Sequence, residues 1–144
     1  MEIKMIHEYK FRVYYKDTDA SGIAYHANYL TYAERARTEM FIEAGLPLSI
    51  LKERGDCFVI RRAEIDYRYP APLESVVTIK SWISEIRPAS CMVMQEFWIE
   101  DKHIATVKLQ AASIDDKTLR PKRMPDDVKA VYEKYLKQGE ENAK

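Results

Sequence analysis

The sequence predicts an α+β fold in which a curved antiparallel sheet wraps around one long central helix, with a second helix near the C-terminus. The expected order of elements is one strand, a long helix, four strands and a final helix. The strands are long and consecutive, which favours antiparallel pairing. The long helix must bury its apolar stripe, and the concave face of the sheet is the only large apolar surface available to cover it. This arrangement is the hotdog fold.

The first expected element is a strand at residues 9–15, "YKFRVYY". Its large apolar side chains alternate with the remaining residues, as in a strand with one buried face. The residues expected on that face are Tyr9, Phe11, Val13 and Tyr15.

The pattern becomes helical at Asn28, which is a plausible N-cap residue. Gly45 is a plausible residue for the turn that follows the helix, and Pro47 prevents its continuation. The spacing between these limits predicts a helix of about four to five turns. The side chains that fall at helical spacing are Leu30, Ala33, Arg37, Met40, Phe41 and Ala44.

Four β-rich segments come next, at residues 57–72, 75–86, 90–100 and 103–115. The first should end at the prolines of "YPAP", because proline cannot donate a hydrogen bond to a sheet. In the second, Val77, Ile79 and Trp82 are expected to point inwards. The residues Glu100, Asp101 and Lys102 should form the hairpin turn between the last two strands.

The last expected element is a helix at residues 125–138 with Pro125 at or near its first position. Its apolar side is formed by Val128, Val131, Tyr132 and Tyr135. No repeat, linker or low-complexity tract divides the chain, so residues 1–144 are expected to form a single domain.

Composition limits the classes of function. The 23 basic and 23 acidic residues cancel, which argues against nucleic acid as a main partner. No apolar run is long enough to span a membrane, and the first ten residues lack the apolar stretch of a signal peptide. Cys57 and Cys91 form no metal-binding pattern and are expected to be buried thiols. A cytoplasmic protein is therefore expected.

The stretch "YKDTDASGIAYHANYLTYAER", residues 15–35, concentrates unusual chemistry between the first strand and the long helix. Asp17 and Asp19 flank a threonine, and Gly22 allows a tight turn or the close approach of a ligand. Taken alone, two such aspartates usually cap a turn. The alternative is that one of them directs a carboxylate towards a bound molecule.

The run Y-x-D-T-D-x-x-G-x-x-Y-H-x-x-Y followed by E-R-A-R resembles the signature of the 4-hydroxybenzoyl-CoA thioesterase family. It is most similar to the bacterial acyl-CoA thioesterase branch encoded near the Tol-Pal system. The segments "EIDYRYPAPLES", "RPAS" and "RPKRMP" fit the same family, so the resemblance extends from about residue 9 to residue 130. It implies a hotdog enzyme that hydrolyses an acyl-CoA thioester to a free acid and CoA.

The resemblance implies that Asp19, the second aspartate of the pair, is the catalytic carboxylate, acting as nucleophile or as general base on water. It also implies that the N–H group of His26 stabilises the oxyanion, and the start of a helix suits that task. Asp17 is expected to support the loop. We expect the His26 side chain to position the substrate or the loop and to bind no metal, because it lacks partners at ligand spacing.

Glu34 and Glu39 on the long helix are the alternative catalytic carboxylates, since some hotdog thioesterases use that helix. An ion pair between Glu34 and Arg37, three residues apart, is the simpler interpretation of Glu34.

An enzyme that binds CoA needs basic side chains for the phosphates of the nucleotide. The predicted contacts are Arg87, Lys122 and Arg123, and further candidates are Arg61, Arg62, Lys117 and Arg120. The acyl group is expected to lie between the central helix and a neighbouring subunit, near Tyr25, Tyr29 and Phe58.

Three alternatives to an acyl-CoA thioesterase remain open: a hydratase, a thioesterase acting on acyl carrier protein, and a module that only binds acyl-CoA. No metal or cofactor is expected. The edge of a small open sheet favours a homodimer, with pairing of dimers into a tetramer.

Overall fold

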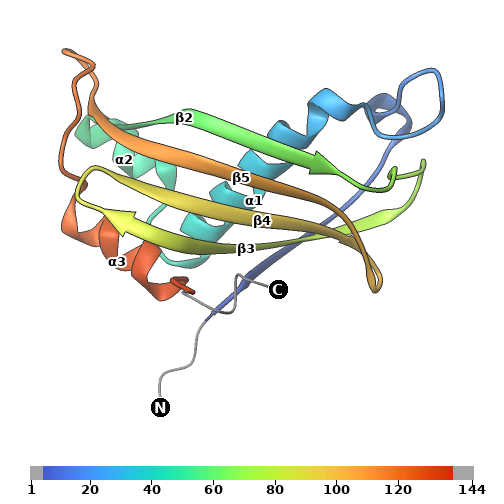
Figure 1. The fold of residues 1–144 in the computed structure, drawn as a ribbon. Helices are drawn as coiled ribbons and strands as arrows, with labels where there is room; N and C mark the ends of the chain where they lie inside the picture. Colours follow the sequence, from blue (N-terminus) through green and yellow to red (C-terminus); the bar gives the residue numbers. More distant parts are fainter. Residues whose placement is uncertain (1–4, 138–144) are drawn as a thin grey trace.

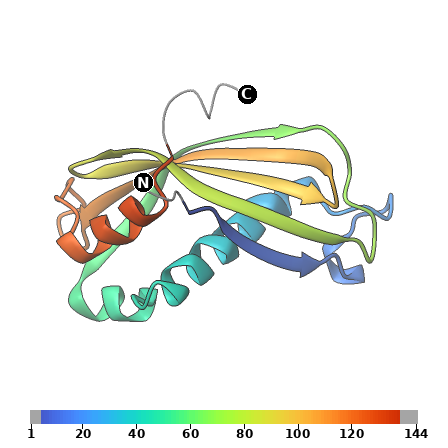
Figure 2. The ribbon, with the colours of Figure 1, turned by 90° about the horizontal axis from the view of Figure 1, so that it is seen from below.

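Five antiparallel strands form one curved sheet in the order β1-β3-β4-β5-β2, and three helices lie on the same side of it (Figure 1; Figure 2). The computed structural model describes residues 5–137. The strands are β1 (His7–Arg12), β2 (Asp56–Tyr67), β3 (Val76–Arg87), β4 (Ser90–Ile99) and β5 (Lys102–Asp115). The helices are α1 (Tyr29–Glu43), α2 (Leu48–Arg54) and α3 (Asp126–Lys134). None of the described helices has the length and apolar character needed to cross a membrane.

The long helix α1 packs against the concave face of the sheet, so the predicted hotdog fold is confirmed. Its buried side chains are Tyr29, Tyr32, Ala33, Ala36, Met40 and Phe41. The expected stripe was partly wrong, because Leu30 is 43% exposed and the two tyrosines take the inward positions. Ile79, Phe97 and Val107 are fully buried and belong to the same core.

A buried polar group connects α1 to the middle of the sheet. The Gln95 amide donates to the Ala33 carbonyl at 2.9 Å and to the Ser81 hydroxyl at 3.0 Å. Its oxygen accepts a hydrogen bond from the Arg37 guanidinium at 3.0 Å. The expected ion pair between Glu34 and Arg37 is not formed in the described part of the chain, because Arg37 turns towards the sheet instead.

The position of Trp82 differs from the prediction. Ser81 pairs with Gln95 and shares its face towards α1, so the next side chain along β3 must point to the opposite face. Trp82 is nevertheless buried, and the Lys137 ammonium lies 4.4 Å from its ring centre.

Several element limits also differ. β2 ends at Tyr67 and not at the prolines of "YPAP". The first strand covers residues 7–12, not 9–15, and Tyr15 is 83% exposed because the chain turns away after Val13. Helix α2 was not predicted; it begins directly after Pro47 and ends at Gly55. Pro125 is the N-cap of α3, directly before its first helical residue, which agrees with the prediction. The helix ends at Lys134, earlier than predicted, and residue 138 of the predicted helix lies outside the described residues.

Candidate active site

The loop between β1 and α1 is held together by hydrogen bonds that Asp17 accepts. Its carboxylate accepts the N–H of Tyr14 at 2.8 Å, which turns the chain away from the sheet into a short 3₁₀ turn. Its main-chain carbonyl accepts the N–H of Tyr25 at 2.9 Å and the side-chain amide of Asn28 at 3.0 Å. Asp17 therefore supports the loop, as its position in the sequence suggested.

Asp19 lies at the tip of this loop, in a tight turn closed by Gly22. The Asp19 carboxylate accepts the N–H of Ser21 at 2.8 Å, and the Asp19 carbonyl accepts the N–H of Gly22 at 3.0 Å. Gly22 has a φ of +77°, a conformation that other residues rarely adopt. No atom lies within 4 Å of the position that a Cβ would take, so a side chain would fit there. Glycine is therefore required by the backbone conformation and not by lack of space. The Asp19 side chain is exposed, and within residues 5–137 its second oxygen accepts no hydrogen bond.

The loop is fixed to the end of the sheet by the segment that follows β2. The N–H of Ala24 donates to the carbonyl of Ala71 at 2.8 Å, and the N–H of Leu73 donates to the carbonyl of Gly22 at 3.1 Å. These bonds hold the loop that carries Asp19 against the segment after β2.

A single 3₁₀ turn, His26–Asn28, leads into α1. Among residues 5–137, the N–H groups of His26 and Ala27 have no hydrogen-bond acceptor, and both residues are exposed. Free N–H groups at a helix start attract negative charge, as the oxyanion of a tetrahedral intermediate requires. Asn28 is the N-cap residue by position, but its side chain does not cap the helix, because it donates to Asp17 instead.

A cavity of about 270 Å³ opens beside this turn. It is lined by Ile23, Ala24, His26, Tyr29, Tyr67, Arg68, Tyr69 and Pro70. Two of the predicted site residues, His26 and Tyr29, lie here together, and burial raises the pKa of Tyr29 to about 12. Tyr25 is exposed, and its ring packs against the His26 ring with 4.7 Å between the ring centres.

Six residues of this cavity were not predicted, and three of them carry an aromatic ring or a charge: Tyr67, Arg68 and Tyr69. The tripeptide before Pro70 carries two aromatic rings and a cation, and this combination could have identified these residues as part of a binding site. No group of three or more His, Cys, Asp or Glu residues suited to a metal ion occurs within residues 5–137.

Phe58 lies elsewhere, in a cavity of about 160 Å³ between α1, β2 and α3. Glu34 and Arg37 line the same cavity. Glu39, the other alternative carboxylate, is half-buried further along α1 and lines neither of these two cavities.

The predicted phosphate contacts lie at the other end of the sheet. Figure 1 shows the loop of residues 13–25 in blue and the loop of residues 116–125 in orange at opposite ends of the molecule. Lys122 and Arg123 belong to the second loop, and Arg87 lies at that end as the last residue of β3. Within one chain, these cations and Asp19 are therefore separated by the length of the sheet.

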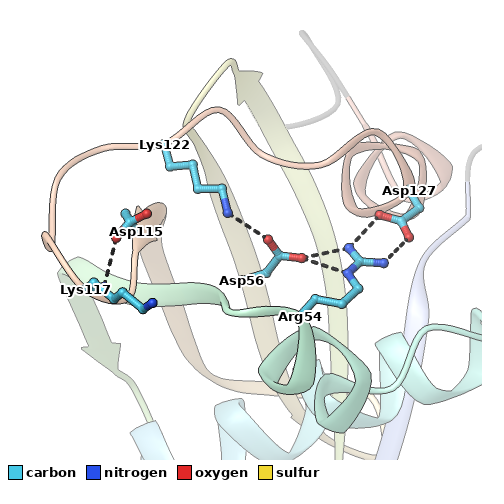
Figure 3. Close-up of polar contacts among 6 residues, drawn as sticks. All are labelled: Arg54, Asp56, Asp115, Lys117, Lys122 and Asp127. Carbon is cyan, nitrogen blue, oxygen red and sulfur yellow. Dashed lines mark hydrogen bonds and ion pairs between the residues drawn. The ribbon is translucent and has the colours of Figure 1, made fainter.

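A charge network holds Lys122 (Figure 3). The Lys122 ammonium lies 3.1 Å from the carboxylate of Asp56, which also pairs with Arg54 at 2.8 Å. Arg54 in turn forms a two-pronged pair with Asp127 of α3. Burial alone would raise the pKa of Asp56, but the hydrogen bonds from Arg54 and Lys122 outweigh it, so the pKa lies below its usual value. Arg123 is exposed.

A hotdog sheet in which one loop carries an exposed carboxylate and then free N–H groups at the start of the central helix is the arrangement expected of a thioesterase. The chain belongs to the thioesterase-like superfamily, whose family model matches residues 13–131.

Particular relatives within this superfamily carry an activity in their names. The chain is 33% identical over 122 residues to the acyl-CoA thioesterase YbgC of Haemophilus influenzae, a match covering 84% of this chain and 90% of that protein. It is 31% identical to the acyl-CoA thioester hydrolase YbgC of Escherichia coli, covering 84% of this chain and 91% of that protein. A crystal structure of a probable thioesterase from Bartonella henselae is similar, with a TM-score of 0.79 and 33% identity, covering 84% of this chain and 100% of that one.

Proposed function

We propose that this protein hydrolyses acyl-CoA thioesters to a free acid and CoA. The observation that carries the proposal is the loop of residues 13–28, in which the exposed Asp19 carboxylate precedes the free N–H groups of His26 and Ala27. The names of the YbgC relatives support acyl-CoA as the substrate.

In the proposed reaction, the thioester carbonyl oxygen accepts a hydrogen bond from the N–H of His26, where negative charge develops. Asp19 then acts in one of two ways. As a general base, it takes a proton from water, and the resulting hydroxide attacks the carbonyl carbon. As a nucleophile, it attacks that carbon itself, and water hydrolyses the resulting anhydride. In both cases the carbon–sulfur bond breaks and CoA leaves as its thiolate, which takes up a proton.

Two of the proposed acyl contacts, Tyr25 and Tyr29, lie beside His26. Four other proposed contacts require a second chain to reach the same substrate. They are the phosphate contacts Arg87, Lys122 and Arg123 and the acyl contact Phe58. Strand β2 offers a place for it, because β2 is an edge strand and its apolar residues Val59 and Ile60 are about two-fifths exposed.

We propose a homodimer in which two β2 strands pair antiparallel, with a tetramer as its further assembly. A two-fold axis would bring the end of β2, near Asp19, to the start of the partner's β2, near its basic loop. Sedimentation at micromolar concentration tests this proposal. A stable monomer that retains full activity would contradict it.

A cytoplasmic location is part of the proposal. Cys57 and Cys91 are both free, which fits a reducing compartment. Cys91 is buried as expected, and burial raises its pKa to about 12, whereas Cys57 is only half-buried.

The test of function is thiol release from a panel of acyl-CoAs, measured for the wild-type protein and for Asp19→Asn. Asparagine has nearly the same size and still accepts the N–H of Ser21, so the turn should persist. We expect kcat to fall by about 10²–10⁴-fold with KM nearly unchanged, the range for loss of a positioned acid–base group. Hydrolysis at the wild-type rate would remove Asp19 from the mechanism and make Glu34 and Glu39 the next carboxylates to test.

A further inference from the structure

The side chain of Tyr67, at the end of β2, reaches across to the start of α1. Its hydroxyl donates a hydrogen bond to the main-chain carbonyl of His26, with 2.7 Å between the two oxygens. The two residues are 41 positions apart in the sequence, so this bond joins the sheet directly to the turn that carries the free N–H groups.

The carbonyl that Tyr67 holds has a second role. It also accepts the N–H of Tyr29, the hydrogen bond that closes the 3₁₀ turn and begins α1. Fixing this oxygen therefore fixes the orientation of the turn, and with it the directions of the N–H groups of His26 and Ala27.

The ring of Tyr67 is itself held in place. It meets the ring of Tyr29 edge-on, with 5.1 Å between ring centres and 84° between planes. It meets the imidazole of His26 in the same way at 6.2 Å. Burial raises the pKa of the Tyr67 phenol, so the hydroxyl stays protonated and remains a donor at neutral pH.

We propose that Tyr67 is a positioning residue, whose hydroxyl aims the oxyanion-binding N–H groups by holding the carbonyl of His26. This inference rests on the proposed function, because it requires that the N–H of His26 stabilises the reacting oxygen. Tyr67 need not touch the reacting atoms. Donors of this kind accelerate a reaction only when they are directed in advance at the place where charge develops.

Tyr67→Phe is the direct test, because it removes the hydroxyl and keeps the ring and its contacts. We expect kcat to fall by roughly 5- to 30-fold, less than the ~10²–10³-fold known for outright removal of an oxyanion donor. KM should stay within about twofold, because the loss concerns the transition state and not the bound substrate.

Tyr9→Phe is the matched control. Tyr9 lies on β1, outside the cavities described above, and among residues 5–137 its hydroxyl makes no hydrogen bond. Its ring stacks on that of Phe11 with 6.1 Å between ring centres, a contact that phenylalanine retains. This variant should keep the wild-type kcat.

A binding measurement separates positioning from general damage to the site. An S-alkyl-CoA thioether has no carbonyl oxygen to engage the N–H groups, so its Kd should be the same for the wild-type protein and Tyr67→Phe. A wild-type kcat in Tyr67→Phe would overturn the inference, and so would a parallel loss of thioether binding. Asp19→Asn, measured beside it, tests the proposed function separately: if only Asp19→Asn is slow, the inference about Tyr67 fails while the mechanism stands.

Discussion

The side-chain amide of Asn28 donates a hydrogen bond to the main-chain carbonyl of Asp17, with 3.0 Å between the two atoms. The N–H of Tyr25 donates to the same carbonyl at 2.9 Å. The two ends of the candidate catalytic loop thus meet at one oxygen atom, and Asp19 is carried by the chain between them.

Replacing Asn28 with alanine should therefore loosen the loop without removing any candidate reacting group. We expect kcat for acyl-CoA hydrolysis to fall by about tenfold, and the free energy of unfolding to fall by about 1 kcal/mol, the usual contribution of one hydrogen bond. Thr31→Ala, an exposed change in the first turn of α1, is the control. Equal kinetics in the two variants would show that the bond to Asp17 does not order the site.

The pair Asp17 and Asp19 can be separated by comparing their asparagine variants. Asp17→Asn keeps an acceptor for the N–H of Tyr14, so its effect on kcat should be much milder than that of Asp19→Asn. Both are measured as thiol release under saturating substrate. If Asp17→Asn abolishes turnover while Asp19→Asn retains most of it, the assignment within the pair is reversed.

The basic loop can be tested with two substrates. Replacing both Lys122 and Arg123 with alanine should raise KM for acyl-CoA by about tenfold, as expected for loss of charged hydrogen bonds to phosphate. A short pantetheine thioester lacks the nucleotide, so its KM should not change.

Two single variants refine this test. Arg123→Ala leaves the pair between Lys122 and Asp56 intact, and Lys117→Ala changes an exposed cation of the same loop. Equal losses on both substrates would indicate a folding defect, and unchanged kinetics on both would show that these side chains do not contact the substrate.

The pH dependence of stability should depend on Asp56. The pKa of Asp56 is lower in the folded protein than in the unfolded chain. The ionised carboxylate therefore contributes its full share to the free energy of unfolding above the usual carboxyl pKa of about 3.9. This contribution is lost as the pH falls through the pKa of the folded state. At neutral pH, Asp56→Asn should be less stable by about 1–2 kcal/mol. The difference should narrow on acidification, as followed by urea unfolding from about pH 7 to about pH 3. Asp126→Asn, an exposed change in α3, is the control. A difference that does not depend on pH would contradict this account.

The polar group in the core should be costly to break. Gln95→Leu leaves Ser81 and the guanidinium of Arg37 without their buried partner, so we expect a loss of about 2–5 kcal/mol in the free energy of unfolding. Met94→Leu, the adjacent residue on the opposite face of β4, should cost less than about 1.5 kcal/mol. Denaturant unfolding of both variants checks the difference.

Most of the fold could be predicted because its strands carry their own periodic signal. The limits expected for β3, β4 and β5 lie within one residue of those observed. The seven residues of α2 are too few to display a helical period. The first strand ended early because the Asp17 carboxylate captures the N–H of Tyr14, an interaction that an alternating pattern does not contain.

The candidate site was predictable only where its residues are close in sequence. Asp19, Tyr25, His26 and Tyr29 belong to one continuous segment. His26 and Tyr29 line one cavity and Tyr25 packs against His26, whereas Asp19 lies in the same loop but does not line that cavity. Tyr67 reaches the site from another strand, and no local pattern indicates a hydrogen bond formed by folding alone. The same reason explains why Phe58 and the basic residues were grouped with Asp19, although one chain keeps them apart.

The separation of the two loops along the sheet has a genetic consequence. If each site combines Asp19 of one subunit with the basic loop of its partner, two impaired proteins should partly restore one another. A dimer formed from an Asp19→Asn chain and a chain lacking Lys122 and Arg123 would contain one site with both defects and one with neither. At acyl-CoA concentrations below KM, mixtures that contain both variants would then be more active than either variant alone. The two alleles would complement one another.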